Sequence, residues 1–149
     1  MKKFSLVLFT KWLLDFMFFS GIMVCLAVPF LFKFAGKYIG TFDRFYIPLC
    51  IIFILAGIFA LAILWELRKM FKTVINENPF IRENVNSLKR MGVCAFIIAV
   101  LMGIKLFFTA TLATLVIILV FIIAGLFSFV LSQVFDQAVT YKLENDLTI

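Results

Sequence analysis

The chain has 149 residues, of which 65% are hydrophobic, and its formal net charge is +6. Soluble domains are about 45–50% apolar, so a water-soluble fold of this size could not cover so much apolar surface, whereas an integral membrane protein needs no such cover. The three cysteines have no CxxC spacing and the chain has no histidine, which argues against a Cys/His zinc site and against histidine-based catalysis. We interpret Cys25, Cys50 and Cys94 as small buried hydrophobes, and a disulfide between Cys25 and Cys50 is the alternative.

The first predicted membrane span covers about residues 12–34. Three lysines precede it, and basic residues collect on the cytoplasmic side of membrane proteins, so we expect the N-terminus in the cytoplasm. Asp15 lies one turn inside the span, where it can reach water or pair with Lys11 at i−4. Pro29 is predicted to kink or end this helix. A short outer loop over residues 33–46 follows.

The second predicted span covers about residues 46–65, and its helical pattern continues into a hairpin. Beyond Trp65 apolar residues recur at helical spacing with basic residues between them, which predicts an amphipathic extension of the helix. Asn78 is then predicted as the N-cap of the next helix and Pro79 as its first residue. The sequence therefore predicts a cytoplasmic helical hairpin over about residues 66–90.

The third and fourth predicted spans cover about residues 91–108 and 112–134. Ala95, Ala99 and Gly103 form a stripe of small residues, which favours close approach of another helix, within the chain or in a second copy. Lys105 lies near the outer end and is expected to reach the headgroups, with a buried functional lysine as the alternative. The last helix is predicted to continue into a cytoplasmic tail over residues 136–149.

The distribution of basic residues supports this topology, because ten lysines and arginines fall on the predicted inner segments and four on the outer ones. The predicted fold is an all-α integral membrane protein with a single domain over residues 1–149. It has four transmembrane helices with both termini cytoplasmic, and helices 2, 3 and 4 extend into a small cytoplasmic helical bundle. In the alternative, the amphipathic extensions lie flat on the inner leaflet.

Three segments resemble the YoaS-like family, whose members are small bacterial membrane proteins of about four helices with no assigned activity. They are Asn78-Pro79-Phe80, the Leu88–Gly92 junction and the C-terminal sequence LSQVFDQAVTYKLENDLTI. The resemblance covers essentially the whole chain and is most specific over residues 144–149. It implies a multi-pass protein of the bacterial cytoplasmic (inner) membrane. Family members are commonly encoded beside a small helix-turn-helix regulator, so the resemblance also implies a partner of that kind.

We therefore predict a membrane-embedded regulatory protein that binds or sequesters a small cytoplasmic helix-turn-helix transcription regulator. A basic DNA-binding domain would be attracted to the acidic side chains of the tail. In the other reading the tail is a helix end held against the cytoplasmic extensions, with its acids paired to Arg82, Lys89 or Arg90. The candidate partner-binding residues are Asn78, Pro79, Phe80, Arg82, Lys89, Arg90, Asp136, Glu144, Asn145, Asp146, Leu147 and Ile149.

The alternative function is that of a small membrane transporter, channel or immunity-type protein, for which polar residues would have to line a path. Apart from Lys33, at the border between the first span and the outer loop, only Asp15 and Lys105 are charged residues within the predicted spans, and they lie near opposite faces. No nucleophile–base pair, metal cluster or phosphate loop is visible, so we expect no enzyme activity, no cofactor and no metal. Direct nucleic-acid binding is not expected, because the basic residues follow the membrane surface. The expected partners are the lipid bilayer and the regulator, and the sequence leaves a homo-oligomer open.

Overall fold

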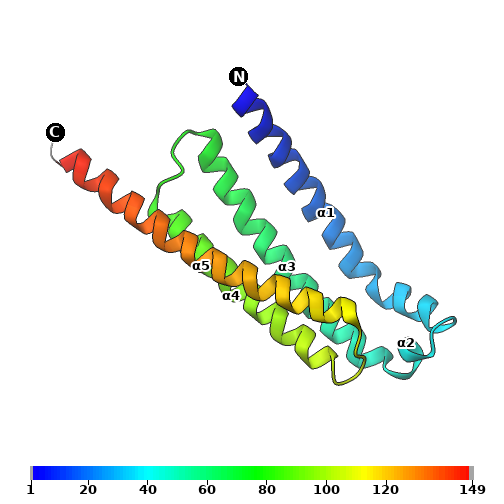
Figure 1. Cartoon of the computed structure of the whole chain (residues 1–149). Helices are drawn as coiled ribbons and strands as arrows, with labels where there is room; N and C mark the ends of the chain where they lie inside the picture. Colours follow the sequence, from blue (N-terminus) through cyan, green and yellow to red (C-terminus); the bar gives the residue numbers. More distant parts are fainter. Residues whose placement is uncertain (1, 148–149) are drawn as a thin grey trace.

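The computed structural model describes residues 2–147, without the side chains of residues 2–4, 41 and 42. Its helices are α1 (Lys2–Gly36), α2 (Gly40–Arg44), α3 (Tyr46–Ile75), α4 (Arg82–Lys105) and α5 (Leu112–Leu147), and no strand occurs in the described part (Figure 1). Four of them, α1, α3, α4 and α5, are each long and apolar enough to cross a membrane. These findings confirm the prediction of an all-α chain with four candidate spans.

The long helices lie side by side in a row, in the order α1, α3, α4 and α5, and each contacts its neighbours in that row (Figure 1). Consecutive long helices run in opposite directions. One end of the molecule therefore carries the start of α1, the connection over residues 76–81 and the end of α5. We call it the basic end. The short helix α2 and the connection over residues 106–111 lie at the opposite end, which we call the α2 end.

Close approach of neighbouring helices depends on two reciprocal pairs of glycines. A Cβ at Gly21 of α1 would lie 2.8 Å from Leu61 of α3, and a Cβ at Gly57 of α3 would lie 2.4 Å from Cys25 of α1. Each helix thus presents a side chain over the glycine of its neighbour. Glycine leaves room at these positions for the side chain of the neighbouring helix, which would have to shift if a Cβ were added.

The α4–α5 pair repeats this arrangement with aromatic rings. A Cβ at Gly92 would lie 2.8 Å from the ring of Phe129, and a Cβ at Gly125 would lie 3.1 Å from the ring of Phe96. The two rings also stack on each other, with centroids 5.8 Å apart and an angle of 18° between their planes. The pair accounts for the tight packing of α4 against α5, which is visible in Figure 1.

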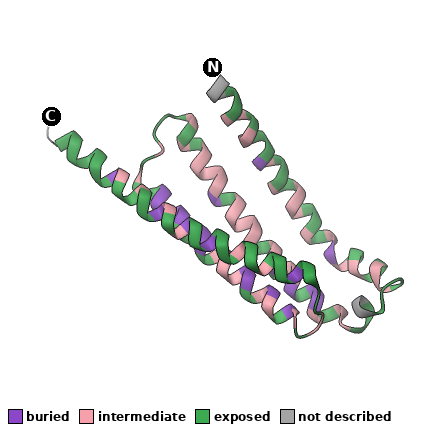
Figure 2. Cartoon of the chain, viewed as in Figure 1, coloured by how far each residue is buried: buried purple, intermediate pink, exposed green. Residues whose placement is uncertain are grey.

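The core lies around α4, which is the most buried of the four long helices (Figure 2). Ile52 and Ala56 of α3 meet Ile98 and Met102 of α4 in its central cluster, and side chains of α5 complete it. Ala95 and Ala99 of the predicted small-residue stripe are buried within the chain. Most apolar side chains of α1 and α5 are exposed on the outside of the row, which suits a surface covered by lipid.

Several local predictions were wrong. Helix α1 does not end at Pro29 but continues to Gly36, because a proline removes only one helical hydrogen bond and packing against α3 holds the flanking turns, and the predicted kink stays a prediction. The outer loop contains α2, which sequence patterning did not predict. The three cysteines are free thiols, so the alternative of a Cys25–Cys50 disulfide is not found.

Asp15 does not pair with Lys11. It accepts a hydrogen bond from Nε of Arg68 at 2.6 Å, and Arg68 belongs to α3. The guanidinium of Arg68 also lies over the ring of Phe18, at 4.9 Å from its centroid. Arg68 lies 53 residues away in sequence, yet it is preferred over the flexible Lys11 because its guanidinium donates to Asp15 and also lies over an aromatic ring.

Candidate partner-binding site

The connection between α3 and α4 is shaped by the way α3 ends. Glu77 has a φ of 60°, and its N–H donates to the carbonyl of Val74 at 3.1 Å. The N–H of Asn78 donates to the carbonyl of Thr73 at 2.9 Å. This pair of bonds is a Schellman motif, which terminates a helix with one residue in the left-handed region. Glycine usually occupies that position, so Glu77 holds a conformation that costs free energy.

A buried asparagine then locks the connection in place. Asn84 is 2% exposed, and its Nδ2 donates to the carbonyl of Pro79 at 2.6 Å and to Oγ1 of Thr73 at 2.8 Å. Thr73 in turn donates to the carbonyl of Met70 at 2.6 Å. Both donors of a buried amide are satisfied, so this network is strong and specific. Asn84 was missed in the sequence, where an asparagine in the first turn of a helix resembles a capping residue.

The predicted start of α4 was wrong. The helix begins at Arg82, its N-cap is Ile81, and no side chain caps it. Asn78 is unavailable as a cap because its Oδ1 accepts a hydrogen bond from Lys142 of α5. Pro79 is not the first helical residue, because the chain remains extended at Ile81 before it enters the helix.

Three contacts join this connection to α5. Asn78 bonds to Lys142, the ring of Phe80 lies 5.3 Å from that of Phe135, and Arg82 forms an ion pair with Asp136. Four predicted site residues are therefore brought together at the basic end: Asn78, Phe80, Arg82 and Asp136. Pro79 joins them through the carbonyl that Asn84 binds.

A second group of charges lies one helix further along the row. Glu66 of α3 is 9% exposed and pairs with Arg90 of α4 at 3.1 Å and with Lys69 at 3.2 Å. The predicted residue Arg90 therefore serves the α3–α4 contact rather than the tail. Lys89 is exposed, and no ion pair of the described residues includes it. The sequence did not identify Glu66 as a site residue, because a single acid beside Trp65 is typical of the end of an apolar segment.

The end of α5 extends beyond the other helices. Residues 140–147 are all exposed, with Tyr141 at 71% and Leu147 at 85% (Figure 2). The expected pairing of the tail acids with Arg82, Lys89 or Arg90 is found for Asp136, which pairs with Arg82, whereas Glu144 and Asp146 take part in none of the ion pairs of residues 2–147. Asn145 lies on the same segment, and Ile149 lies outside the described residues.

This extension, residues 140–147, exposes two carboxylates, an aromatic ring and two leucines on helical turns against which no other described helix packs. Among residues 2–147 no three Cys, Asp or Glu side chains gather in a way that could hold a metal ion.

Comparison with known sequences identifies the family. Residues 30–149 match the family model described as a protein of unknown function, DUF2975. The chain belongs to this family. The DUF2975 match begins near the end of α1 and includes every residue of the candidate site, whereas most of α1 lies outside it. The finer resemblance to YoaS-like members stays a prediction. No curated protein and no solved structure matches the chain.

Proposed function

We propose that this chain is a regulatory protein of the bacterial cytoplasmic membrane, with both termini in the cytoplasm, that binds a small helix-turn-helix regulator at its basic end. The observation that carries the proposal is the exposed extension of α5. A helix end made only to finish a membrane span needs no further turns, yet these turns carry Tyr141, Leu143 and Leu147 exposed to solvent. Exposed apolar side chains of this size mark interaction surfaces.

Charge supports the choice of partner. Glu144 and Asp146 have no cationic partner within residues 2–147, so they can attract a basic surface without first breaking an ion pair. DNA-binding regulators are basic where they meet phosphates. Binding at these acids would compete with DNA for the same basic surface, and this competition is a direct route from membrane binding to gene regulation.

The orientation rests on the positive-inside rule. The basic end carries the cations near both termini and those of the α3–α4 hairpin. The hairpin cations are Arg68, Lys69, Lys72, Arg82, Lys89 and Arg90. The α2 end has Lys33, Lys37, Arg44 and Lys105. This asymmetry favours a cytoplasmic basic end. The length of α3 agrees, because 30 residues span about 45 Å against a hydrocarbon core of about 30 Å.

The test is co-purification of the full-length protein from its native host in mild detergent, with bound proteins identified by mass spectrometry. We expect a small helix-turn-helix protein, and we expect to lose it when residues 144–149 are deleted or when Glu144→Gln and Asp146→Asn are combined. The matched control is Glu83→Gln, which removes an exposed acid from the first turn of α4 and should retain the partner. Recovery of the membrane protein alone, with the tail intact, would refute the proposal.

The alternative of a transporter, channel or immunity-type protein has less support. A path for ions needs polar side chains along the spans, and Asp15 is already neutralised by Arg68 near the basic end. Flux through liposomes that disappears in Asp15→Asn would favour this alternative over the regulatory function.

A further inference from the structure

A second site lies at the α2 end, about as far from the candidate partner-binding site as the molecule allows. A cavity of about 630 Å³ opens there between α2, the first turns of α3 and the α4–α5 connection. Its lining combines Lys105, Arg44 and Thr109 with the apolar side chains of Ile39, Leu49 and Phe108. Neither the family match nor the proposed regulatory function assigns a role to this cavity.

The central residue of this cavity is Lys105, which is 9% exposed and was expected to extend to the membrane surface. Its Nζ donates to Oγ1 of Thr114 at 2.7 Å and lies 5.8 Å from the centroid of the Phe53 ring. An ammonium has three donors, and Thr114 is the one hydrogen-bond acceptor of Lys105 among the described residues, so two donors have no acceptor there. No described carboxylate forms an ion pair with it. A buried charge left in this state is costly unless an anion or another acceptor meets it.

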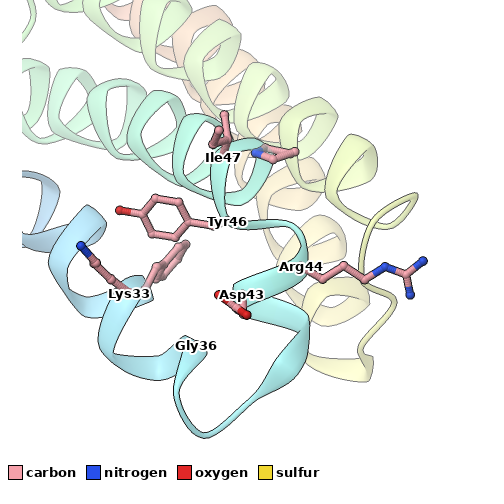
Figure 3. A pocket seen from close by; sticks show the side chains of 8 residues that line it. Lys33, Gly36, Asp43, Arg44, Tyr46 and Ile47 are labelled. Carbon is pink, nitrogen blue, oxygen red and sulfur yellow. The ribbon is translucent and has the colours of Figure 1, made fainter.

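Other groups around the cavity add positive potential. Arg44 lies over the ring of Phe45, at 5.3 Å from its centroid, and no carboxylate of the described residues pairs with it. Figure 3 shows the Arg44 side chain directed away from Asp43 and Lys33, which line a neighbouring cavity of about 430 Å³. Arg44 lines both cavities, so its charge is shared between them, and no ion pair of the described residues joins it to Asp43.

Two threonines complete the polar part of the cavity. Thr111 caps α5 by accepting the N–H of Thr114 at 3.3 Å, so the positive end of the α5 dipole lies beside Lys105. The Oγ1 of Thr109 is buried and has no hydrogen-bond partner among the described residues. A buried hydroxyl without a partner, next to a buried ammonium with two free donors, is the arrangement expected of a site for an oxyanion.

We propose that this cavity binds a phosphate group, with Lys105 and Arg44 as its charged ligands and Thr109 as a further hydrogen-bond donor. The phosphate would be that of an anionic glycerophospholipid in the leaflet at the α2 end, or the free ion. The apolar walls favour the lipid, because Leu49 and Phe108 can cover the first part of an acyl chain while the phosphate meets the cations. The site is independent of the regulatory partner and of the tail of α5.

The test uses full-length protein in a nonionic detergent and three probes: phosphatidylglycerol, phosphatidylcholine and inorganic phosphate. Native mass spectrometry counts retained lipid, and thermal unfolding reports binding. We expect one phosphatidylglycerol per chain, bound more tightly than phosphatidylcholine, whose choline neutralises the phosphate. Lys105→Met should weaken phosphatidylglycerol binding by about tenfold or more, since a charge-assisted bond is lost. Lys37→Gln, which removes an exposed lysine of the same end outside the cavity, should bind as wild type.

Arg44→Gln provides a second variant if Lys105→Met fails to fold, because Arg44 is exposed at the rim and its loss leaves the core intact. It should also weaken binding of phosphatidylglycerol. In another outcome, inorganic phosphate raises the unfolding temperature of the wild type but not of Lys105→Met, and lipid has no effect. This result would support the phosphate site and identify the free ion as its ligand. Equal binding of both lipids, or phosphatidylglycerol binding unchanged in both variants, would overturn the proposal.

Discussion

Arg68 and Asp15 form the one ion pair, among those of residues 2–147, that joins α1 to the rest of the row. Nε of Arg68 donates to Oδ1 of Asp15 at 2.6 Å, and the guanidinium is also within 5.6 Å of the ring centroids of Phe19 and Trp65. Asp15 lies outside the DUF2975 match and Arg68 lies inside it. The pair therefore connects the matched part of the chain to the helix that precedes it.

Asp15→Asn should lower the free energy of unfolding by about 1 kcal/mol, because both side chains are partly exposed and the loss of charge weakens but does not abolish the hydrogen bond. Arg68→Lys should cost at least as much, since lysine keeps the charge but loses the Nε hydrogen bond and the contacts with three rings. Thermal unfolding in detergent measures both effects. Lys72→Gln, an exposed cation one turn further along α3, is the control and should unfold as wild type. Wild-type stability of Arg68→Lys would contradict this account of the pair.

Glu77→Gly should stabilise the protein by about 0.5–1 kcal/mol. The residue has a φ of 60° in the Schellman motif, and glycine removes the steric cost of that conformation, partly offset by the greater freedom of glycine in the unfolded chain. Glu77→Ala is the matched control, because alanine removes the carboxylate but keeps the Cβ. The unfolding temperature should rise for glycine and not for alanine; an equal rise in both would mean that charge, not backbone strain, is the cause.

Gly92→Ala should destabilise the α4–α5 pair by about 1–3 kcal/mol, because the new Cβ would lie 2.8 Å from the ring of Phe129. That ring cannot move aside easily, since it stacks on Phe96. Gly103→Ala, on the same helix, meets no atom within 4 Å and should be neutral or slightly stabilising. A comparison of the two unfolding temperatures checks the prediction, and equal effects would show that helix propensity rather than close packing dominates.

The proposed topology predicts opposite labelling of the two ends. In a variant whose three native cysteines are replaced by alanine, Lys37→Cys should react with a membrane-impermeant maleimide on intact spheroplasts. Glu144→Cys should react only after permeabilisation, because the positive-inside rule places the basic end in the cytoplasm. Both positions are exposed, so a difference in reactivity reports the membrane side rather than burial. The reverse pattern would contradict the proposed orientation and, with it, a cytoplasmic partner at the tail.

Helices were predictable where a single periodic pattern decides the structure. The continuation of α3 past Trp65 and of α5 past Val134 follows from apolar residues at helical spacing, and both helices continue as predicted. The start of α4 was not predictable from local rules, because Asn78 and Pro79 form a good capping sequence but Lys142 of α5 takes the asparagine side chain. Local capping preference does not determine where a helix begins when a residue distant in sequence binds the capping side chain.

The same reasoning explains the charged residues. Asp15 and Lys105 each lie near the end of a predicted span, so sequence alone suggests that both reach water or headgroups. Their environments depend on which helices are neighbours: Arg68 of α3 reaches Asp15, and α2 with the α4–α5 connection covers Lys105. Sequence periodicity carries no information on that arrangement. Glu144 and Asp146 were identified correctly as polar positions, but only the structure shows that they have no ionic partner among residues 2–147, whereas Asp136 pairs with Arg82.

The row arrangement has a consequence for synthesis. Each long helix packs against the one made just before it, so no contact between helices has to wait for a segment at the distant end of the chain. Assembly can therefore proceed as the ribosome delivers each span, with α3 docking on α1, then α4 on α3, and α5 last, since local contacts are closed at low entropic cost. The extension of α5, which would receive the regulator, is completed only when the rest of the protein is already in place.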